Sequence, residues 1–462
     1  MTSALAVRPV AVTPALLLAL HAAWPERYPA LLESAATAEP LGRFDILFAC
    51  PGLKLTLRSG QGLAADASLD TTGSFLDALD RWWLRERIAR DELPPTDFPV
   101  PFTGGWLVYL GYELAGQIEP RLRLPHSDRG LIAQAVRVPA AIVYDRVNGD
   151  GWIVAERAAA SALDVIAADL ERVDPLQAAG SSLLRADIIE DAPELYLHAI
   201  ERALEHIVAG DIYQANLSRS WHARLNPGIK PVHLYQRLRR TNPGPFCGIA
   251  VFDDMAIVSS SPERLVAVRD GWIATRPIAG TRPRGTDTLS DAELARELRA
   301  HPKEQAEHVM LVDLERNDLG RVCEPGSVLV DEFMTIESYA HVHHIVSNIR
   351  GKLRTDVTPG QALAAVFPGG TITGCPKVRC MEIIASLEST PRGAYTGSLG
   401  YLNRDGSMDF NILIRSLEVH GDRVSLRAGA GIVADSIPQR ELEESRAKAR
   451  GVLRALSDEV AP

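Results

Sequence analysis

The sequence predicts a large protein of the mixed α/β class, because short β-type runs and amphipathic helical segments alternate along its whole length. The chain has 462 residues, enough for two or three domains of about 100 to 200 residues or for one unusually large unit. Hydrophobic residues make up 46% of it and charged residues 23%, so a sizeable core is expected. These observations exclude peptide hormones, isolated recognition modules and coiled coils.

The charge balance argues against two classes of partner. Lys and Arg number 49 and Asp and Glu number 59, which gives a net charge of −10. A surface without a basic surplus attracts neither phosphate backbones nor anionic lipids. We therefore expect neither nucleic acid nor a membrane as a partner.

The cysteines and the longest N-terminal apolar run bear on the compartment. The five cysteines are an odd number and lack disulfide or zinc spacing, which fits a reducing, cytoplasmic environment. The apolar run of residues 15–23 is shorter than the about 20 residues that cross a bilayer. We interpret this run as a short core helix rather than a signal peptide.

The first part of the chain combines strands with one clear helix. Helical periodicity covers residues 76–90, and the Ala-rich, polar residues 158–187 look like a surface connection. We therefore separate an N-terminal region, residues 1–185, from a second region, residues 186–462. The β-type runs of the N-terminal region are residues 44–48, 53–57, 140–144 and 151–155.

The second region begins with a helix and continues with many strands. Asp191 precedes Pro193 and Glu194 with capping-box spacing, and apolar side chains keep a helical period until Gly210. The number of later β-type runs favours a large mixed or antiparallel sheet. These runs are residues 251–259, 264–268, 272–276, 397–402, 409–419 and 423–433.

Two glycine-rich segments resemble nucleotide-binding motifs but lack their context. GAGIVA (429–434) has the spacing of a dinucleotide fingerprint, yet DSIP follows where a helix must begin. FPGGTITGCPK (367–377) lacks the GxxxxGK[ST] spacing of a phosphate loop. Glycines at a strand end still let backbone amides approach another anion, such as a carboxylate.

Two pairs of carboxylates have helical spacing. Glu304 and Glu307 are three residues apart on one predicted helix, and Glu441 and Glu444 repeat that spacing on another, with Lys448 four residues further on. Each pair alone is typical of a solvated helix face.

The surroundings of these pairs favour a binding site. His344, Thr371 and Arg415 interrupt apolar stretches in the same part of the chain. Mg²⁺ takes one or two carboxylates together with substrate oxygens, and an arginine, a lysine and glycine-loop amides suit a small polycarboxylate. From the residues alone we infer a magnesium-assisted site for a small di-acid.

Eight sequence strings then identify a family. They are SPER (261–264), RPIAGTRPRG (276–285), EHVMLVDLERNDLGR (307–321), HIVS (344–347), FPGGTITGCPK, NILIRS (411–416), AGAGIVADS (428–436) and ELEES (441–445). In these strings, in their order, the chain resembles the chorismate-utilising enzymes: component I of anthranilate synthase or of aminodeoxychorismate synthase, and the isochorismate and salicylate synthases. The resemblance covers residues 190–455 and, more weakly, residues 28–115.

This resemblance implies both a fold and a set of catalytic groups. The implied fold is α/β (α+β), a large two-sheet β-sandwich flanked by helices of the anthranilate synthase component I type, with the active site in the second region. Glu263 would be the general acid that helps the ring hydroxyl of chorismate to leave. His344 and Thr371 would form hydrogen bonds near that hydroxyl.

The resemblance also implies a cofactor and substrate-binding residues. Glu307 and Glu444 would hold Mg²⁺, with Glu304 and Glu441 in support, and the cation would fix the ring carboxylate. The residues that would bind the substrate's carboxylates are Tyr395 and Arg415, the backbone of Gly429, and Lys448.

Two positions bear on the nucleophile. Isochorismate and salicylate synthases use a lysine to activate water at the position where this chain has Gln214. Because glutamine cannot act as a base, the addition of ammonia is favoured over the addition of water. Aminodeoxychorismate synthases commonly carry an attacking lysine where this chain, like anthranilate synthases, has Ala279. Strings that nevertheless resemble the aminodeoxychorismate branch are GRFDI (42–46), NPGPF (242–246), RNDLGR (316–321), FPGGTITG and GSLGYLNRDGSMDFNILIR (397–415).

We therefore predict the amination of chorismate to 4-amino-4-deoxychorismate, for para-aminobenzoate and folate synthesis. The alternative within this family is anthranilate synthase component I. A non-enzymatic alternative is a chorismate or tryptophan sensor with the same fold, which loss of Glu263, Glu307 or Glu444 would have indicated, and none of them is lost.

The remaining expectations concern a partner and a second ligand. No cysteine stands in a Gly-flanked nucleophile turn, so we expect ammonia from a separate glutaminase subunit. LLES (31–34) resembles the tryptophan-site motif of this fold, which makes Ser34 a candidate tryptophan ligand. The alternative for LLES is a helix end that packs on the sheet.

Overall fold

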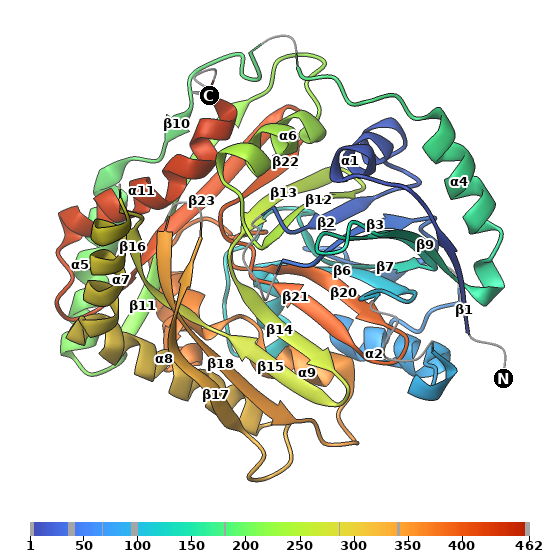
Figure 1. The fold of residues 1–462 in the computed structure, drawn as a ribbon. Helices are drawn as coiled ribbons and strands as arrows, with labels where there is room; N and C mark the ends of the chain where they lie inside the picture. Colours follow the sequence, from blue (N-terminus) through green and yellow to red (C-terminus); the bar gives the residue numbers. More distant parts are fainter. Residues whose placement is uncertain are drawn as a thin grey trace.

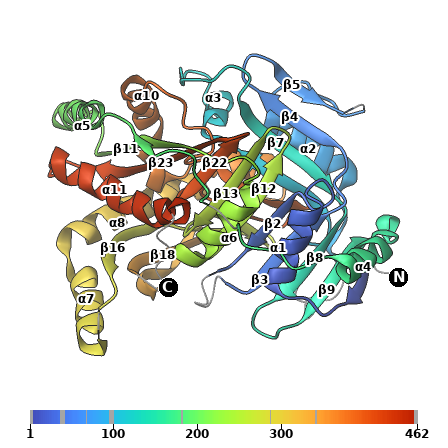
Figure 2. The same cartoon turned by 90° about the horizontal axis from the view of Figure 1, so that it is seen from above.

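Two large antiparallel sheets form the centre of the structure, and helices lie around them (Figure 1). The structure is a computed structural model that describes residues 4–35, 42–66, 68–93, 100–179, 182–285, 287–339 and 342–457. The view from above shows the same arrangement (Figure 2). This architecture confirms the expected α/β fold with two sheets and flanking helices.

The first sheet has 12 strands within the described residues. In order across the sheet they are β1 (Leu5–Pro9), β9 (Gly151–Glu156), β8 (Ala140–Asp145), β3 (Phe44–Ala49), β2 (Ala30–Glu33), β12 (Phe246–Phe252), β13 (Met255–Ser261), β22 (Ser416–His420), β23 (Arg423–Ile432), β11 (Gln214–Arg224) and β10 (Ile189–Glu190), with β19 (Gly374–Cys375) paired to β11.

The second sheet has 11 strands in the same part of the chain. Across it lie β16 (Ile278–Pro283), β18 (Val342–Lys352), β15 (Trp272–Arg276), β14 (Arg264–Arg269), β21 (Met408–Asn411), β20 (Ser398–Asn403), β6 (Gly105–Leu110), β7 (Leu131–Val138), β4 (Lys54–Arg58) and β5 (Gly62–Ala65), with β17 (Leu329–Ser338) paired to β18.

Both sheets combine strands from the two regions of the chain. Leu32 of β2 lies opposite Gly248 of β12 in the first sheet, and Leu107 of β6 lies opposite Tyr401 of β20 in the second. The division at residues 185 and 186 therefore stays a prediction about sequence regions, because those regions share both sheets.

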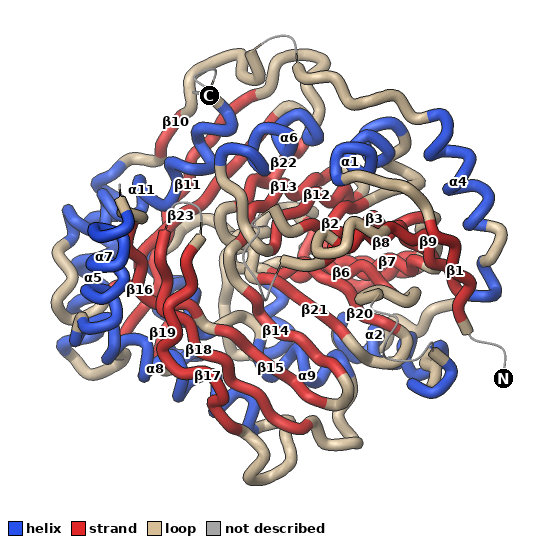
Figure 3. The backbone as a smooth tube through the Cα atoms, in the orientation of Figure 1, coloured by secondary structure: helices blue, strands red, loops and turns tan. Residues whose placement is uncertain are grey.

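Helices surround the sheets on both sides (Figure 3). Those in contact with the first sheet are α1 (Pro14–Ala23), α4 (Ala162–Arg172), α5 (Pro193–Val208), α6 (Pro231–Thr241), α10 (Lys377–Leu387) and α11 (Pro438–Leu456). Those in contact with the second sheet are α2 (Phe75–Glu86), α7 (Thr288–Ala300), α8 (Pro302–Gly320) and α9 (Pro359–Val366), and the short α3 (Ala115–Ile118) follows β6. Across the described residues we find no helix with the length and apolarity needed to traverse a bilayer.

A buried apolar cluster joins the two sheets. Phe48 and Ile257 come from the first sheet, and Phe102, Leu107 and Leu399 come from the second sheet or its connections. The rings of Phe48 and Phe102 are 4.9 Å apart in an edge-to-face arrangement, which favours aromatic pairs. This cluster holds the sheets in a fixed relative position and so supports a site built from both.

Several elements differ from the sequence expectations for local reasons. Helix α4 occupies part of the expected surface connection, where Ile166 packs into the core. The expected strand 251–259 is interrupted by a turn at residues 253–254, with Asp253 at φ 48°, so that residues 251–252 end β12 and residues 255–259 lie on β13. The expected strand 409–419 is broken before β22, with Arg415 at φ 52°. LLES lies mainly on strand β2 rather than at a helix end.

Candidate active site

The candidate site residues come from segments far apart in the sequence, all in the second region. Strands provide Gln214 (β11), Ala279 (β16), His344 (β18) and Gly429 (β23). Helices provide Glu304 and Glu307 (α8) and Glu441, Glu444 and Lys448 (α11). Thr371 lies in a short helical turn, and Glu263, Tyr395 and Arg415 lie in connecting segments. Their interactions decide which of these side chains the fold brings together.

Glu263 is a buried carboxyl between β13 and β14, with 4% of its surface exposed. Burial raises its pKa to about 7. The groups that lower this pKa are Thr371, the backbone N–H of Ile278, Arg415 and Lys448. A carboxyl that is half protonated near neutral pH can donate a proton to a leaving hydroxyl, as the role of general acid requires.

His344 is a buried, neutral imidazole. Its Nδ1 lies 2.9 Å from Oγ1 of Thr281 on the neighbouring strand β16. Burial, together with the positive charge of Arg415, lowers its pKa to about 3. Its Nε2 is buried and has no hydrogen-bond partner in the part of the chain that the structure describes. The ring thus has one nitrogen fixed by the fold and one left for a ligand.

Thr371 and Arg415 are further polar groups beside Glu263. The Thr371 hydroxyl is buried close enough to Glu263 to lower the pKa of that carboxyl, but it forms no hydrogen bond of standard geometry with a described residue. Burial lowers the pKa of the Arg415 guanidinium, and Glu263 partly offsets this effect. An unfilled hydroxyl and a desolvated cation beside an acid form a ready site for an anionic, hydroxylated ligand.

Glu307, Glu304 and Glu444 form a cluster of like charges. Burial raises the pKa of Glu307, and Glu304 and Glu444 raise it further. Two cations offset this negative charge: Nζ of Lys448 lies 2.8 Å from Oε1 of Glu444, and Nη1 of Arg282 lies 3.3 Å from Oε1 of Glu304. The carboxylates from α8 and α11 therefore belong to one site.

This cluster fits a magnesium ion that is bound partly by substrate. No three His, Cys, Asp or Glu side chains among the described residues are grouped closely enough to hold a metal unaided. Mg²⁺ usually keeps several waters and takes one or two carboxylates plus substrate oxygens. A divalent cation near Glu307 and Glu444 would also relieve the repulsion that raises the pKa of Glu307.

Gln214 lies against the carboxylate cluster. Its Nε2 donates to Oε1 of Glu307 at 2.9 Å, whereas its own Oε1 is buried and lacks a partner among the described residues. The glycine at position 431 makes room for it, because a Cβ there would lie 2.3 Å from Nε2 of Gln214. The free acceptor of Gln214 can receive a hydrogen bond from a nucleophile but cannot remove a proton from water.

Tyr395 and Gly429 lie close to these groups. Burial raises the pKa of the Tyr395 phenol, whereas Arg392 and Lys448 lower it. Gly429 lies opposite Ser218 on the adjacent strand, where a Cβ would come within 1.9 Å of the carbonyl oxygen of Leu217. Only glycine fits this close approach of two strands.

Three predicted residues have a less direct relation to this cluster. Glu441 is buried at the start of α11. Burial raises the pKa of Tyr196, and the negative charge of Glu441 adds to this effect. Ala279 is buried opposite Ile345 and offers no functional group. Ser34 lies outside the site, directly after β2, and its backbone N–H donates to Oδ1 of Asp45 at 3.1 Å.

A cavity of about 650 Å³ adjoins the segment that contains Ser34. Leu32 and Glu33 line it from β2, together with Phe246 and Tyr401. Burial and the neighbouring Asp45 raise the pKa of Glu33 to about 7. The cavity is large enough for an amino acid, and the role of Ser34 in tryptophan binding stays a prediction.

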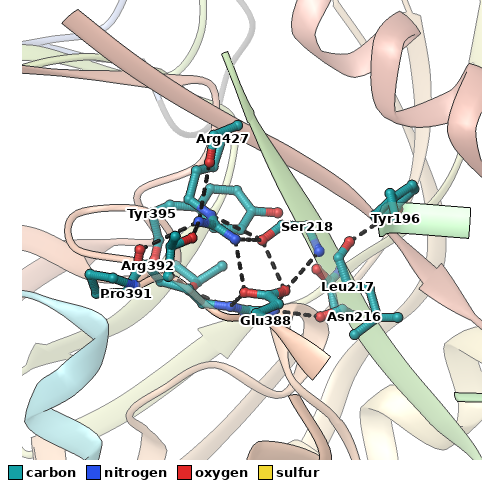
Figure 4. A network of polar contacts seen from close by, with 12 residues as sticks. Tyr196, Asn216, Leu217, Ser218, Glu388, Pro391, Arg392, Tyr395 and Arg427 are labelled. Atoms are coloured by element: carbon teal, nitrogen blue, oxygen red, sulfur yellow. Dashed lines mark hydrogen bonds and ion pairs between the residues drawn. The ribbon is translucent and has the colours of Figure 1, made fainter. Parts of the chain in front are cut away.

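Sequence reasoning missed the groups that hold the site in place. Thr281, which orients His344, was overlooked although it stands in the RPIAGTRPRG string. Glu388, Arg392 and Arg427 form a buried ion network beneath Tyr395 (Figure 4). The sequence signal for them is weak: Glu388 and Arg392 are four residues apart in a polar connection, and Arg427 is a charged residue among the apolar residues of β23.

A family model described as "chorismate binding enzyme" matches residues 47–454. The chain belongs to this family. Membership confirms the expected family and makes the chain a chorismate-utilising enzyme. The matched range contains all the candidate residues of the active site and excludes Ser34.

Relatives of this chorismate-binding enzyme carry two different names. The anthranilate synthase component I-like protein of Synechocystis is 42% identical over 77% of this chain and 73% of its own length. Aminodeoxychorismate synthase component 1 of Bacillus subtilis is 39% identical over 92% of this chain and 91% of its own length. The crystal structure of anthranilate synthase component I from Streptococcus pneumoniae superposes with a TM-score of 0.79 at 31% identity, over 90% of this chain and 93% of that one.

Proposed function

We propose that this enzyme is component I of an aminodeoxychorismate synthase. It replaces the ring hydroxyl of chorismate by ammonia, which gives 4-amino-4-deoxychorismate and water for para-aminobenzoate and folate synthesis. The site offers a buried acid, unpartnered polar groups and several cations, which together suit a small di-acid that loses a hydroxyl.

Gln214 is the observation that carries the choice of ammonia over water. Its Nε2 donates one hydrogen bond to Glu307, and its carbonyl oxygen has no partner among the described residues, which leaves a buried acceptor beside the carboxylate cluster. A carbonyl oxygen accepts a hydrogen bond from ammonia, which is already a nucleophile, whereas water needs a base. This geometry therefore supports amination.

The buried acid supplies the proton for the leaving group. In the proposed reaction the ring C–O bond breaks as Glu263 transfers its proton to the departing hydroxyl, and water leaves. The imidazole of His344 and the hydroxyl of Thr371, both unpartnered, would hydrogen-bond near that oxygen. The proton lost by the added ammonium group can restore Glu263, so protons balance over the cycle.

The substrate's two carboxylates and the metal have separate partners in this proposal. Arg415 and Tyr395 bind the enolpyruvyl carboxylate with help from the backbone of Gly429. Lys448 lies by the ring carboxylate, near Glu307. The metal-holding groups would be Glu307 and Glu444, with Glu304 and Glu441 in support. When bound, Mg²⁺ supplies positive charge at the ring carboxylate.

Ammonia would come from a separate glutaminase subunit, component II. Every cysteine is a free thiol, and burial raises the pKa of Cys247, Cys375 and Cys380, which makes each of them a poor nucleophile. The chain therefore has no evident means of hydrolysing glutamine itself. Free thiols also suit the reducing cytoplasm that we propose as its compartment.

Anthranilate synthase component I is the second candidate. Ala279 favours it, because this buried methyl group cannot attack the ring as the lysine of many aminodeoxychorismate synthases does. Several of the relatives are also named anthranilate synthase component 1. This enzyme would further eliminate pyruvate and yield an aromatic product. A chorismate or tryptophan sensor is the non-enzymatic candidate, and the retained acid Glu263 argues against it.

Product analysis distinguishes these candidates. The purified chain is incubated with chorismate, Mg²⁺ and ammonium at alkaline pH, and the products are separated and identified by mass and fluorescence. We expect non-aromatic aminodeoxychorismate. Fluorescent anthranilate would support the second candidate, isochorismate would contradict amination, and unchanged chorismate would favour the sensor.

A further inference from the structure

Arg392 lies beneath the candidate site in the connection between α10 and β20, with 4% of its surface exposed. Its Nε and Nη2 donate to Glu388 at 2.9 and 2.7 Å, and Nη2 also donates to the carbonyl oxygen of Asn216 at 2.6 Å. Its Nη1 donates to the carbonyl oxygen of Ile372 at 3.2 Å and to Oγ1 of Thr396 at 3.4 Å. All five N–H groups of the guanidinium therefore have an acceptor.

The acceptors of Arg392 are neighbours of the residues that face the ligand. Asn216 is two residues after Gln214, Ile372 follows Thr371, and Thr396 follows Tyr395. All three segments meet around this one planar cation. Its bonds therefore set the relative positions of three candidate site residues.

The guanidinium of Arg392 also lies between two aromatic rings. Its central carbon is 4.8 Å from the ring centre of Tyr112 and 5.6 Å from that of Tyr395. A cation at this distance from a ring is attracted to it and limits where the ring can lie. The proposed carboxylate ligand Tyr395 is thereby held from below.

Arg427 provides an internal comparison, because it shares the anion and strand β11 with Arg392 but donates to neither Ile372 nor Thr396. Its Nη2 donates to Oε2 of Glu388 at 2.9 Å (Figure 4). Its other acceptors are Ser218, Ser220, Thr390 and the carbonyl oxygen of Pro391. Burial alone would raise the pKa of Glu388, but Arg392 and Arg427 outweigh it and the net pKa is lowered. Both arginines therefore compensate one buried carboxylate.

We propose that Arg392 is a positioning residue of the chorismate site. It fixes Tyr395, the Thr371 turn and the start of β11 relative to one another, and it does not touch the substrate. Arg427 stabilises the same buried anion without this role. The choice of chorismate as ligand rests on the proposed function, whereas the geometry of Arg392 does not.

The first test compares Arg392→Lys with Arg427→Lys. Lysine keeps the charge opposite Glu388 but has three donors that cannot match a planar set of five acceptors. We expect Arg392→Lys to raise KM for chorismate at least tenfold and to lower kcat/KM at least thirtyfold. We expect Arg427→Lys to lower Tm by a similar amount but to keep KM and kcat within threefold. Equal kinetic losses, or an unchanged KM in Arg392→Lys, would overturn the proposal.

A second variant covers the case in which Arg392→Lys does not fold. Thr396→Val removes one acceptor of Arg392 and leaves both ion pairs with Glu388 in place, so the fold should persist. We expect KM for chorismate to rise about threefold with an unchanged Tm, because the Tyr395 segment becomes less well fixed. An unchanged KM in this variant would count against the role of Arg392.

A binding measurement separates this inference from the proposed reaction. Chorismate with Mg²⁺ should raise the Tm of the wild-type chain whether or not ammonia is added. If chorismate raises the Tm of the wild type but no amination is found, the proposed function fails. The role of Arg392 is then still tested by whether Arg392→Lys loses this rise in Tm. Retention of the full rise by Arg392→Lys would overturn the inference alone.

Discussion

Oγ1 of Thr281 lies 2.9 Å from Nδ1 of His344, across two neighbouring strands of the second sheet. The next histidine has a similar partner: Nδ1 of His343 lies 2.8 Å from Oγ of Ser338 on β17. Only His344 belongs to the candidate site. The effect of removing the hydroxyl beside His344 can therefore be compared with the effect of removing the hydroxyl beside His343.

Thr281→Val should lower kcat about tenfold, because the neutral imidazole of His344 loses the group that orients it. The measurement is the initial rate of chorismate consumption at saturating ammonium. Ser338→Ala, which removes the partner of Nδ1 of His343 and leaves its contact with Asp291, serves as the control and should keep kcat within twofold. Equal effects of both substitutions would indicate general loosening of the strands rather than a role for His344.

Glu263→Gln should lower kcat by about 10² to 10⁴ without weakening chorismate binding, because the amide cannot donate an acidic proton. Rates and chorismate-induced changes in Tm are measured on the same preparation. A variant as active as the wild type would move the general acid elsewhere, with His344 the next candidate.

The pH dependence of the wild type follows from the same carboxyl. Its pKa of about 7 means that Glu263 loses its proton as pH rises through 7, so kcat at fixed free ammonia should fall above that pH. Burial raises this pKa above that of the unfolded chain, so the folded state loses stability between about pH 4.5 and pH 7 as pH rises. Above pH 7, Glu263→Gln should therefore be more stable than the wild type, by on the order of 3 kcal/mol. Equal stabilities at pH 8 would contradict a raised pKa.

Removal of divalent cations should abolish turnover, because the carboxylate cluster leaves Mg²⁺ as the electrophile at the ring carboxylate. Glu307→Gln and Glu444→Gln should have the same effect while the fold is kept, as circular dichroism would show. Glu443→Gln, on the exposed face of α11, is the matched control and should keep full activity. If a tenth of the activity survives in EDTA, the magnesium assignment is wrong.

The isolated chain should use ammonium salts but not glutamine. Its rate should rise with the concentration of free ammonia, and glutamine should support turnover near pH 7 only after a class I glutamine amidotransferase is added. Product formation is measured with each nitrogen source in turn. Glutamine-dependent product from the chain alone would mean that it contains a hydrolase site.

L-Tryptophan should raise Tm by filling the cavity beside β2, and Ser34→Ala should reduce this rise. Chorismate turnover should change less than twofold when L-tryptophan is added, because Ser34 and this cavity lie outside the candidate active site. L-Alanine is the control ligand. If L-tryptophan leaves Tm unchanged, the prediction for Ser34 is wrong.

Sequence reasoning proposed residues that would face the ligand and missed the residues that hold them in place. Glu263, Glu307 and Gln214 stand in strings of fixed composition, so each could be assigned before any contact was known. Arg392 and Glu388 are only four residues apart on the chain, yet their importance depends on carbonyl groups from distant segments. Such convergence is a property of the tertiary fold, which no local pattern encodes.

Strand boundaries failed for a related reason. Apolar residues recur on both sides of Arg415 through residues 409–419, so the pattern predicts one strand. The fold instead turns the backbone at Arg415 into the left-handed region, at φ 52°, and directs its side chain toward Glu263. We interpret this left-handed backbone as a conformation that the proposed substrate-binding role of Arg415 requires.

The pairing of β2 with β12 and of β6 with β20 has a consequence for how such a gene can change. A recombination event near codon 185 would join an N-terminal region from one ancestor to a second region from another. The new protein would have to match side chains along two inter-strand seams at once, one in each sheet. The two regions are therefore expected to be inherited together, and domain shuffling should add new modules at the ends of the gene rather than at its middle.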